Sequence, residues 1–69
     1  MLVEFEVKKI IEIIDDCQKY VNKKKHMPSN FNLTPREFKI CQKARQEGIK
    51  LTVKFNDEVR PIQLSKRYN

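Results

Sequence analysis

Two different periodicities succeed one another at the start of the chain. Over residues 2–8 apolar side chains alternate with charged ones, a period of two that is typical of a half-buried strand. Beyond them, apolar residues recur at helical spacing as far as Val21, with lysines and acids on the opposite face. The pattern predicts a strand at 2–7 and a helix at 8–24. A single helix over 2–24 is the alternative, because such patterns define the ends of an element poorly.

The second predicted helix carries a nearly complete set of end signals. Thr34 is suited to the N-cap, a proline follows at the first helical position, and Glu37 completes a capping box three residues after the cap. Gly48 stands where a left-handed residue commonly ends a helix. These signals predict a helix at 35–47, preceded by a loop at 26–33.

Alternation of apolar and polar residues returns after Gly48 and predicts a β-hairpin at 49–64. A turn is expected where polar residues interrupt the pattern, with the reversal at Asp57 and Glu58. That register places Val53 opposite Ile62 and keeps one face of the hairpin apolar.

The predicted fold is a single α+β domain over 1–69, a two-helix unit with a C-terminal hairpin in the order β-α-α-β-β. The N-terminal strand could complete a three-stranded antiparallel sheet. Pro61 has no N–H to donate, so the last strand should be an edge, and the polar residues 65–69 should form a frayed tail. The expected core comprises Ile10, Ile14, Cys17, Val21, Phe38, Cys41, Leu51, Val53 and Ile62.

The fold is expected to need a further source of stability, such as a disulfide, a metal ion or a second subunit. A domain of 69 residues buries only about 60% of the surface exposed by its unfolded chain. Cys17 and Cys41 form no C-x-x-C pair and His26 is the only histidine, so no structural metal and no cofactor are expected. Both cysteines lie on apolar helix faces, which favours buried structural thiols, with a redox-sensitive pair as the alternative.

Association into a homodimer is the remaining source of additional stability. The predicted helix 8–24 has an unusually wide apolar arc, because Ile11, Ile13 and Tyr20 widen its apolar stripe. Such a helix must contact more than one element of its own chain or a second subunit.

Neither catalysis nor membrane insertion is indicated. A nucleophile–base pair would require His26, which lies in a lysine-rich loop, and a single glycine cannot build a phosphate-binding loop. The longest apolar run is only a few residues, so we expect no signal peptide, no membrane partner and a cytoplasmic location. The chain is not expected to be an enzyme.

The positive charge is concentrated after the first helix. Residues 1–22 carry five acidic and three basic side chains, whereas residues 23–69 carry twelve basic and four acidic ones. This asymmetry favours an acidic partner, either nucleic acid or an acidic protein. The candidate nucleic-acid-binding residues are Lys23, Lys24, Lys25, Arg36, Lys39, Gln42, Lys43, Lys54, Arg60, Lys66 and Arg67.

Two functions are consistent with this sequence. In the first, a small regulatory protein contacts the phosphate backbone of DNA or RNA through its second helix and hairpin, and Gln42 could read adenine edges. In the second, a small inhibitor or adaptor of bacterial or phage origin binds a protein through an apolar helix face or an edge strand. A solvated lysine-rich surface without a binding role is the simplest interpretation of the charge. One continuous basic face would favour nucleic acid, whereas cations scattered around the molecule would favour the solvated surface. A third, minor possibility is an accessory subunit of a larger complex.

Overall fold

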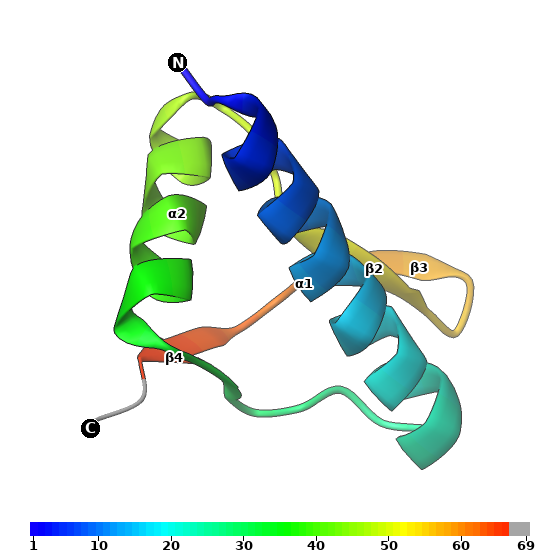
Figure 1. The fold of residues 1–69 in the computed structure, drawn as a ribbon. Helices are drawn as coiled ribbons and strands as arrows, with labels where there is room; N and C mark the ends of the chain where they lie inside the picture. Colours follow the sequence, from blue (N-terminus) through cyan, green and yellow to red (C-terminus); the bar gives the residue numbers. More distant parts are fainter. Residues whose placement is uncertain (67–69) are drawn as a thin grey trace.

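The computed structural model describes residues 1–66 as two helices and four short strands. In chain order the elements are α1 Glu4–Lys24, β1 Phe31–Leu33, α2 Pro35–Gln46, β2 Thr52–Phe55, β3 Glu58–Pro61 and β4 Leu64–Lys66. The strands form two separate pairs, an antiparallel hairpin of β2 and β3 and a parallel pair of β1 and β4. Figure 1 shows α1 in the middle of the molecule, with α2 on one side and the hairpin on the other. The α+β class and the C-terminal hairpin are confirmed.

The strand predicted at 2–7 is wrong, because the first helix already begins at Glu4. Val3 keeps an extended backbone and is the N-cap. Its side chain cannot accept a hydrogen bond, but the Glu6 carboxylate accepts one from the Val3 N–H at 3.0 Å. Acidic residues in the first turn also favour the positive end of the helix dipole. The alternative of one long helix therefore describes α1 closely.

The ends of both helices follow from local chemistry. Lys25 adopts a left-handed conformation, with φ of 62°, and its N–H donates to Val21 at 2.9 Å. At α2 the predicted capping box between Thr34 and Glu37 is present. After α2, Gly48 has φ of 85°, and the next N–H, that of Ile49, donates to Ala44 at 3.0 Å. This is a Schellman arrangement, and it confirms the predicted end of α2.

The hairpin is shorter than predicted and its register differs by two residues. Val53 faces Arg60 rather than Ile62, and the strands cover 52–61 instead of 49–64. The turn residues are Asn56 and Asp57, both with positive φ. Asn and Asp tolerate this conformation, which a two-residue turn of type I′ requires, whereas a reversal at Asp57 and Glu58 would impose it on a glutamate. Because the shift is even, Val53 still points to the core.

The chain after the hairpin returns to the start of α2. Leu64, Ser65 and Lys66 pair in parallel with Phe31, Asn32 and Leu33. Residues 26–33, predicted to be entirely loop, therefore contain a strand at their end. The expectation of a frayed tail from residue 65 is wrong for Ser65 and Lys66, and residues 67–69 lie outside the described part. Figure 1 shows β4 next to the N-terminal end of α2.

A hydrogen-bonded side chain occupies the edge of β2 that faces α1. The Gln18 amide accepts from the Lys54 N–H at 2.8 Å and donates to the Lys54 carbonyl at 2.9 Å. It thus satisfies both backbone groups that a neighbouring strand would otherwise bond. No third strand joins the hairpin within residues 1–66.

The hydrophobic core lies between α1, α2 and the strands. Most of the predicted core residues are buried, but Ile14 and Phe38 are only half-buried. Core positions beyond the predicted set are Ile13, Leu33, Ile40 and Ala44. The burial of Ile13 weakens the argument for a dimer, since this residue belongs to the core. Neither helix in the described residues is long and apolar enough to span a bilayer.

Truncating the core at Ile62 should strongly destabilise the protein. Its side chain is 1% exposed, so Ile62→Ala should lower the free energy of unfolding by about 2–5 kcal/mol. Urea denaturation monitored by circular dichroism measures the change. Ile11→Ala, at a position that is 61% exposed, is the control and should change stability by no more than about 0.5 kcal/mol. Equal losses in both variants would contradict the core described here.

Candidate nucleic-acid interface

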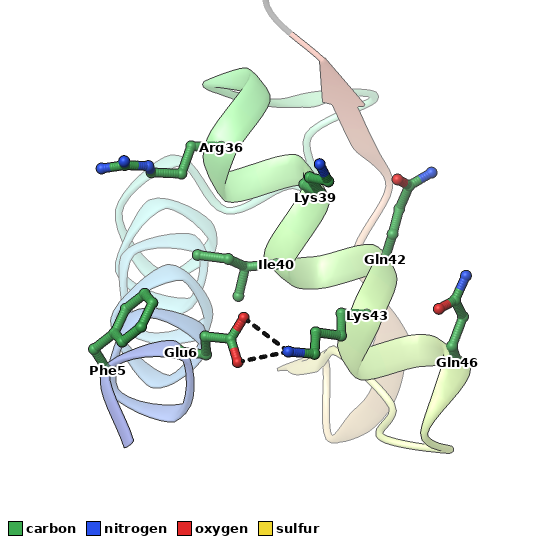
Figure 2. A pocket seen from close by; sticks show the side chains of 8 residues that line it. All are labelled: Phe5, Glu6, Arg36, Lys39, Ile40, Gln42, Lys43 and Gln46. Atoms are coloured by element: carbon green, nitrogen blue, oxygen red, sulfur yellow. Dashed lines mark hydrogen bonds and ion pairs between the residues drawn. The ribbon is translucent and has the colours of Figure 1, made fainter. Parts of the chain in front are cut away.

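A groove of about 910 Å³ lies between the first turn of α1 and the outer face of α2. Four of the candidate residues line it, and all four come from successive turns of α2: Arg36, Lys39, Gln42 and Lys43. The lining residues are Phe5 and Glu6 from α1, and Arg36, Lys39, Ile40, Gln42, Lys43 and Gln46 from α2. Figure 2 shows Phe5 and Arg36 toward α1, and Gln42 and Gln46 projecting from α2 on the side away from α1.

The middle of the groove is occupied by an ion pair. Both carboxylate oxygens of Glu6 contact the Lys43 Nζ, at 3.0 and 3.2 Å (Figure 2). Glu6 is only 8% exposed. Hydrogen bonds from the Val3 N–H and from Lys43 lower the pKa of the Glu6 carboxyl. The charge of Lys43 is therefore already balanced, and this lysine ties the two helices together rather than offering a free cation.

A second ion pair joins the helices beside the N-terminus of α2. Lys9 Nζ lies 3.3 Å from Glu37, whose carboxylate also accepts from the Thr34 N–H at 3.1 Å. Burial would raise the pKa of Glu37, but the hydrogen bonds from Thr34 and Lys9 outweigh it and the pKa is lowered. The same contact with Glu37 raises the pKa of Lys9. The helices are thus held in an antiparallel arrangement along the groove.

Arg36 and Lys39 are the cations of the groove that remain available. Neither takes part in an ion pair or side-chain hydrogen bond within residues 1–66, and both are exposed. Phe5 adds an aromatic ring that is 66% exposed. The groove therefore combines two free positive charges with an accessible ring and amide groups.

A second group of candidate residues gathers at the opposite end of α1. Lys23 and Lys24 lie in its last turn and Lys25 caps it. Lys25 and Lys54 line a shallow hollow of about 180 Å³. Figure 1 shows this end of α1 far from α2. The candidate cations thus do not form one continuous basic face, and by itself this distribution favours a solvated lysine-rich surface over a nucleic-acid interface.

The remaining candidates lie apart from both groups or have partners. Arg60 on β3 donates to Glu58 at 2.8 Å. Lys66 ends β4 opposite Leu33, beside the start of α2. Arg67 lies outside the described residues.

The histidine and both cysteines of the chain lie within the described residues 1–66. In that part of the chain, no group of three or more histidine, cysteine or acidic residues is arranged to hold a metal ion. The rings of His26 and Tyr20 are arranged edge to face, with their centroids 5.8 Å apart. Cys17 and Cys41 are fully buried free thiols, and burial raises the pKa of both. High pKa values and burial are typical of unreactive structural cysteines.

Sequence reasoning missed the two groove residues from α1. Phe5 and Glu6 fall in the segment predicted as a strand, where Phe5 would be inward and Glu6 outward. The structure reverses both. A usable signal was present, because Glu4 and Glu6 suit the first turn of a helix and an acid three residues after the N-cap can accept its N–H.

Comparison with known proteins adds nothing to this geometry. Neither the family models nor the curated proteins and solved structures contain a significant match to the chain.

The lowered pKa values of Glu6 and Glu37 predict sensitivity to acid. A carboxyl whose pKa is lower in the folded state stabilises the fold above its unfolded pKa, and the contribution disappears as pH falls through the folded pKa. The free energy of unfolding should therefore be nearly constant between about pH 7 and pH 5 and should decline below about pH 4. Urea titrations across this range measure it.

Replacing Glu6 tests how much this carboxylate contributes to the loss of stability at acid pH. Glu6→Gln should be less stable than the wild type near neutral pH and should lose less stability on acidification, because the variant has already lost the ionised pair. Glu4→Gln is the matched control, since Glu4 is an exposed acid in the same turn. A Glu6→Gln variant with the stability and pH dependence of Glu4→Gln would contradict the role assigned to Glu6.

Proposed function

We propose that the protein binds single-stranded nucleic acid, DNA or RNA, in the groove between α1 and α2. The observation that carries the proposal is the exposed Phe5 ring beside two cations, Arg36 and Lys39, that have no acidic partner among residues 1–66. Binding of single strands typically combines a positively charged groove with aromatic side chains on which bases stack.

Arg36 and Lys39 supply the electrostatic part of this interaction. They are three residues apart on α2, so they lie on the same side of the helix. Both line the groove without an acidic partner in the described part of the chain, whereas the charge of Lys43 is balanced by Glu6. Contact with phosphates would release condensed counterions and make the affinity dependent on salt.

Phe5 supplies the stacking part and favours a single strand over a duplex. The ring lies on the same side of the groove as Arg36 (Figure 2). In a duplex the base faces are already stacked on each other, whereas a single strand can offer one face to the ring. Gln42 and Gln46, on the side of α2 away from α1, have amide groups suited to base edges.

The lysines at the C-terminal end of α1 would contribute attraction at longer range. Lys23, Lys24 and Lys25 lie close together in sequence, and Lys54 adds a fourth charge near Lys25. A charge cluster of this kind accelerates encounter with an anionic polymer even without a fixed contact.

Binding can be tested by fluorescence anisotropy with labelled mixed-sequence single strands and duplexes of equal length. We expect tighter binding of the single strand, and a marked loss of affinity between about 50 and 200 mM salt. Absence of binding to any of these nucleic acids at low salt would refute the proposal.

Variants separate the two contributions in the groove. Arg36→Ala and Lys39→Ala should each weaken binding and reduce the slope of log affinity against log salt by about 0.7 for a single strand. Phe5→Ala should weaken binding by about 5- to 100-fold and leave that slope unchanged, because stacking releases no counterions. Lys50→Ala removes an exposed cation outside the groove and is the matched control.

Lys43→Ala is a poor test of phosphate contact. Its loss would leave the Glu6 carboxylate without its ionic partner, so the variant should lose stability as well as any affinity. A thermal melt of each variant is therefore recorded beside its binding curve.

A second candidate function is binding to a protein, as a small inhibitor or adaptor. It is favoured by exposed apolar side chains along the first half of α1, namely Val3, Val7 and Ile11. Val7 and Ile11 are four residues apart and lie on one face of the helix. If this function is correct, Arg36→Ala, Lys39→Ala and Phe5→Ala should still bind the protein partner with full affinity. It becomes the better explanation if no nucleic acid binds.

A further inference from the structure

We propose that two copies of the protein associate through the outer edge of β3, forming a continuous four-stranded antiparallel sheet. The proposal is independent of the proposed nucleic-acid function. It rests on the direction of the backbone groups of Val59 and on a charge pattern in β3 that is complementary to itself.

The outer edge of β3 is identified by the contacts of Lys54. The Lys54 N–H and carbonyl both bond the Gln18 amide, so they point away from β3. Lys54 is opposite Val59 in the hairpin. In an antiparallel ladder, both residues of such a non-hydrogen-bonded pair direct their backbone groups outward. The N–H and carbonyl of Val59 therefore face away from β2.

The two edges of the hairpin differ in whether their backbone groups have a hydrogen-bond partner. Gln18 satisfies the backbone of β2 on one side, whereas all four residues of β3 are exposed on the other. The Val59 side chain is 67% exposed. An edge with unpaired backbone groups is a template for an added strand.

A second copy fits this edge when the pairing is centred on Val59. Each Val59 then faces Val59 of the other copy and exchanges two backbone hydrogen bonds with it. In the same register Glu58 of one copy lies opposite Arg60 of the second copy, and this pair occurs twice by symmetry. These are non-hydrogen-bonded positions, where opposing side chains come closest, and opposite charges there stabilise the pairing.

The same features limit the extent of the pairing. Pro61 has no N–H to contribute, and the chain reverses at Asn56 and Asp57. The ladder is therefore restricted to about three residues per copy, and the interface is small. Within one copy Glu58 and Arg60 already form an exposed ion pair at 2.8 Å, so association exchanges the two internal pairs, one in each copy, for two pairs between copies.

A charge-exchange experiment tests this register on the intact protein. Glu58→Arg and Arg60→Glu each place like charges opposite one another and should weaken self-association about tenfold. An equimolar mixture of the two variants restores opposite charges only between copies, so it should associate at least as tightly as the wild type. The ion pair within each copy stays broken in that mixture, which separates the dimer contact from hairpin stability.

The matched control uses an exposed ion pair on α1. Asp15 and Lys19 are 3.0 Å apart and exposed. Asp15→Lys and Lys19→Glu change the net charge by the same amounts as the β3 variants, so their mixture reports any general attraction between oppositely altered proteins. Self-association is measured by sedimentation equilibrium over a range of concentrations.

Backbone protection gives a second readout. The Val59 amide should exchange with solvent more slowly as concentration rises, whereas Val59→Pro, which removes this N–H, should abolish association. Circular dichroism establishes whether the proline variant is folded, and the charge exchange decides the question if it is not. A wild-type mass that stays monomeric up to about 1 mM, or a mixture that associates no better than the α1 control mixture, would overturn the proposal.

Discussion

The structure depends on the burial of one carboxylate between its two helices. Glu6 accepts the N–H of Val3 and so allows α1 to begin at Glu4. It also meets Lys43 in an ion pair and so sets the distance between α1 and α2. A buried charge without its partner is costly, and therefore the helix start and the helix packing depend on each other. The same pair lies in the middle of the groove between the helices.

The same constraint changes how the positive charge of the chain is understood. A count of lysines and arginines suggests a broad basic surface, but Lys9, Lys43 and Arg60 are each paired with an acid. Such pairs contribute little to long-range attraction. Most of the remaining candidate cations lie in two groups near opposite ends of α1, and other cations such as Lys50 and Lys66 lie apart from both, so they do not form one face. The argument for nucleic acid therefore rests on the local chemistry of the groove, with an aromatic ring beside two unpaired cations, more than on net charge.

The hairpin shows how a small fold satisfies its backbone without a larger sheet. The β1–β4 pair is separate from the hairpin, and the side chain of Gln18 takes the place of a third strand at β2. Arg45 similarly donates to the carbonyl of Ile62, in the link between the strand pairs, at 3.0 Å. Side chains from the helices thus bond backbone groups that neighbouring strands bond in larger sheets. The outer edge of β3 has no such partner among residues 1–66.

Features encoded within a few residues were determined by the sequence alone. The capping box at Thr34, the left-handed Gly48 and the alternation around Val53 act through neighbours in the chain, so α2 and the presence of the hairpin could be predicted, as could most of the core. The register of the hairpin was predicted wrongly by two residues. The groove could be predicted only in its α2 half. The start of α1 at Glu4 had a local signal in the acids of its first turn, although the alternation over residues 2–8 predicted a strand. Tertiary structure decided the pairing of β1 with β4 and the role of Lys43. Each depends on a partner distant in sequence, such as Lys43 for Glu6, and local periodicity carries no information about that partner.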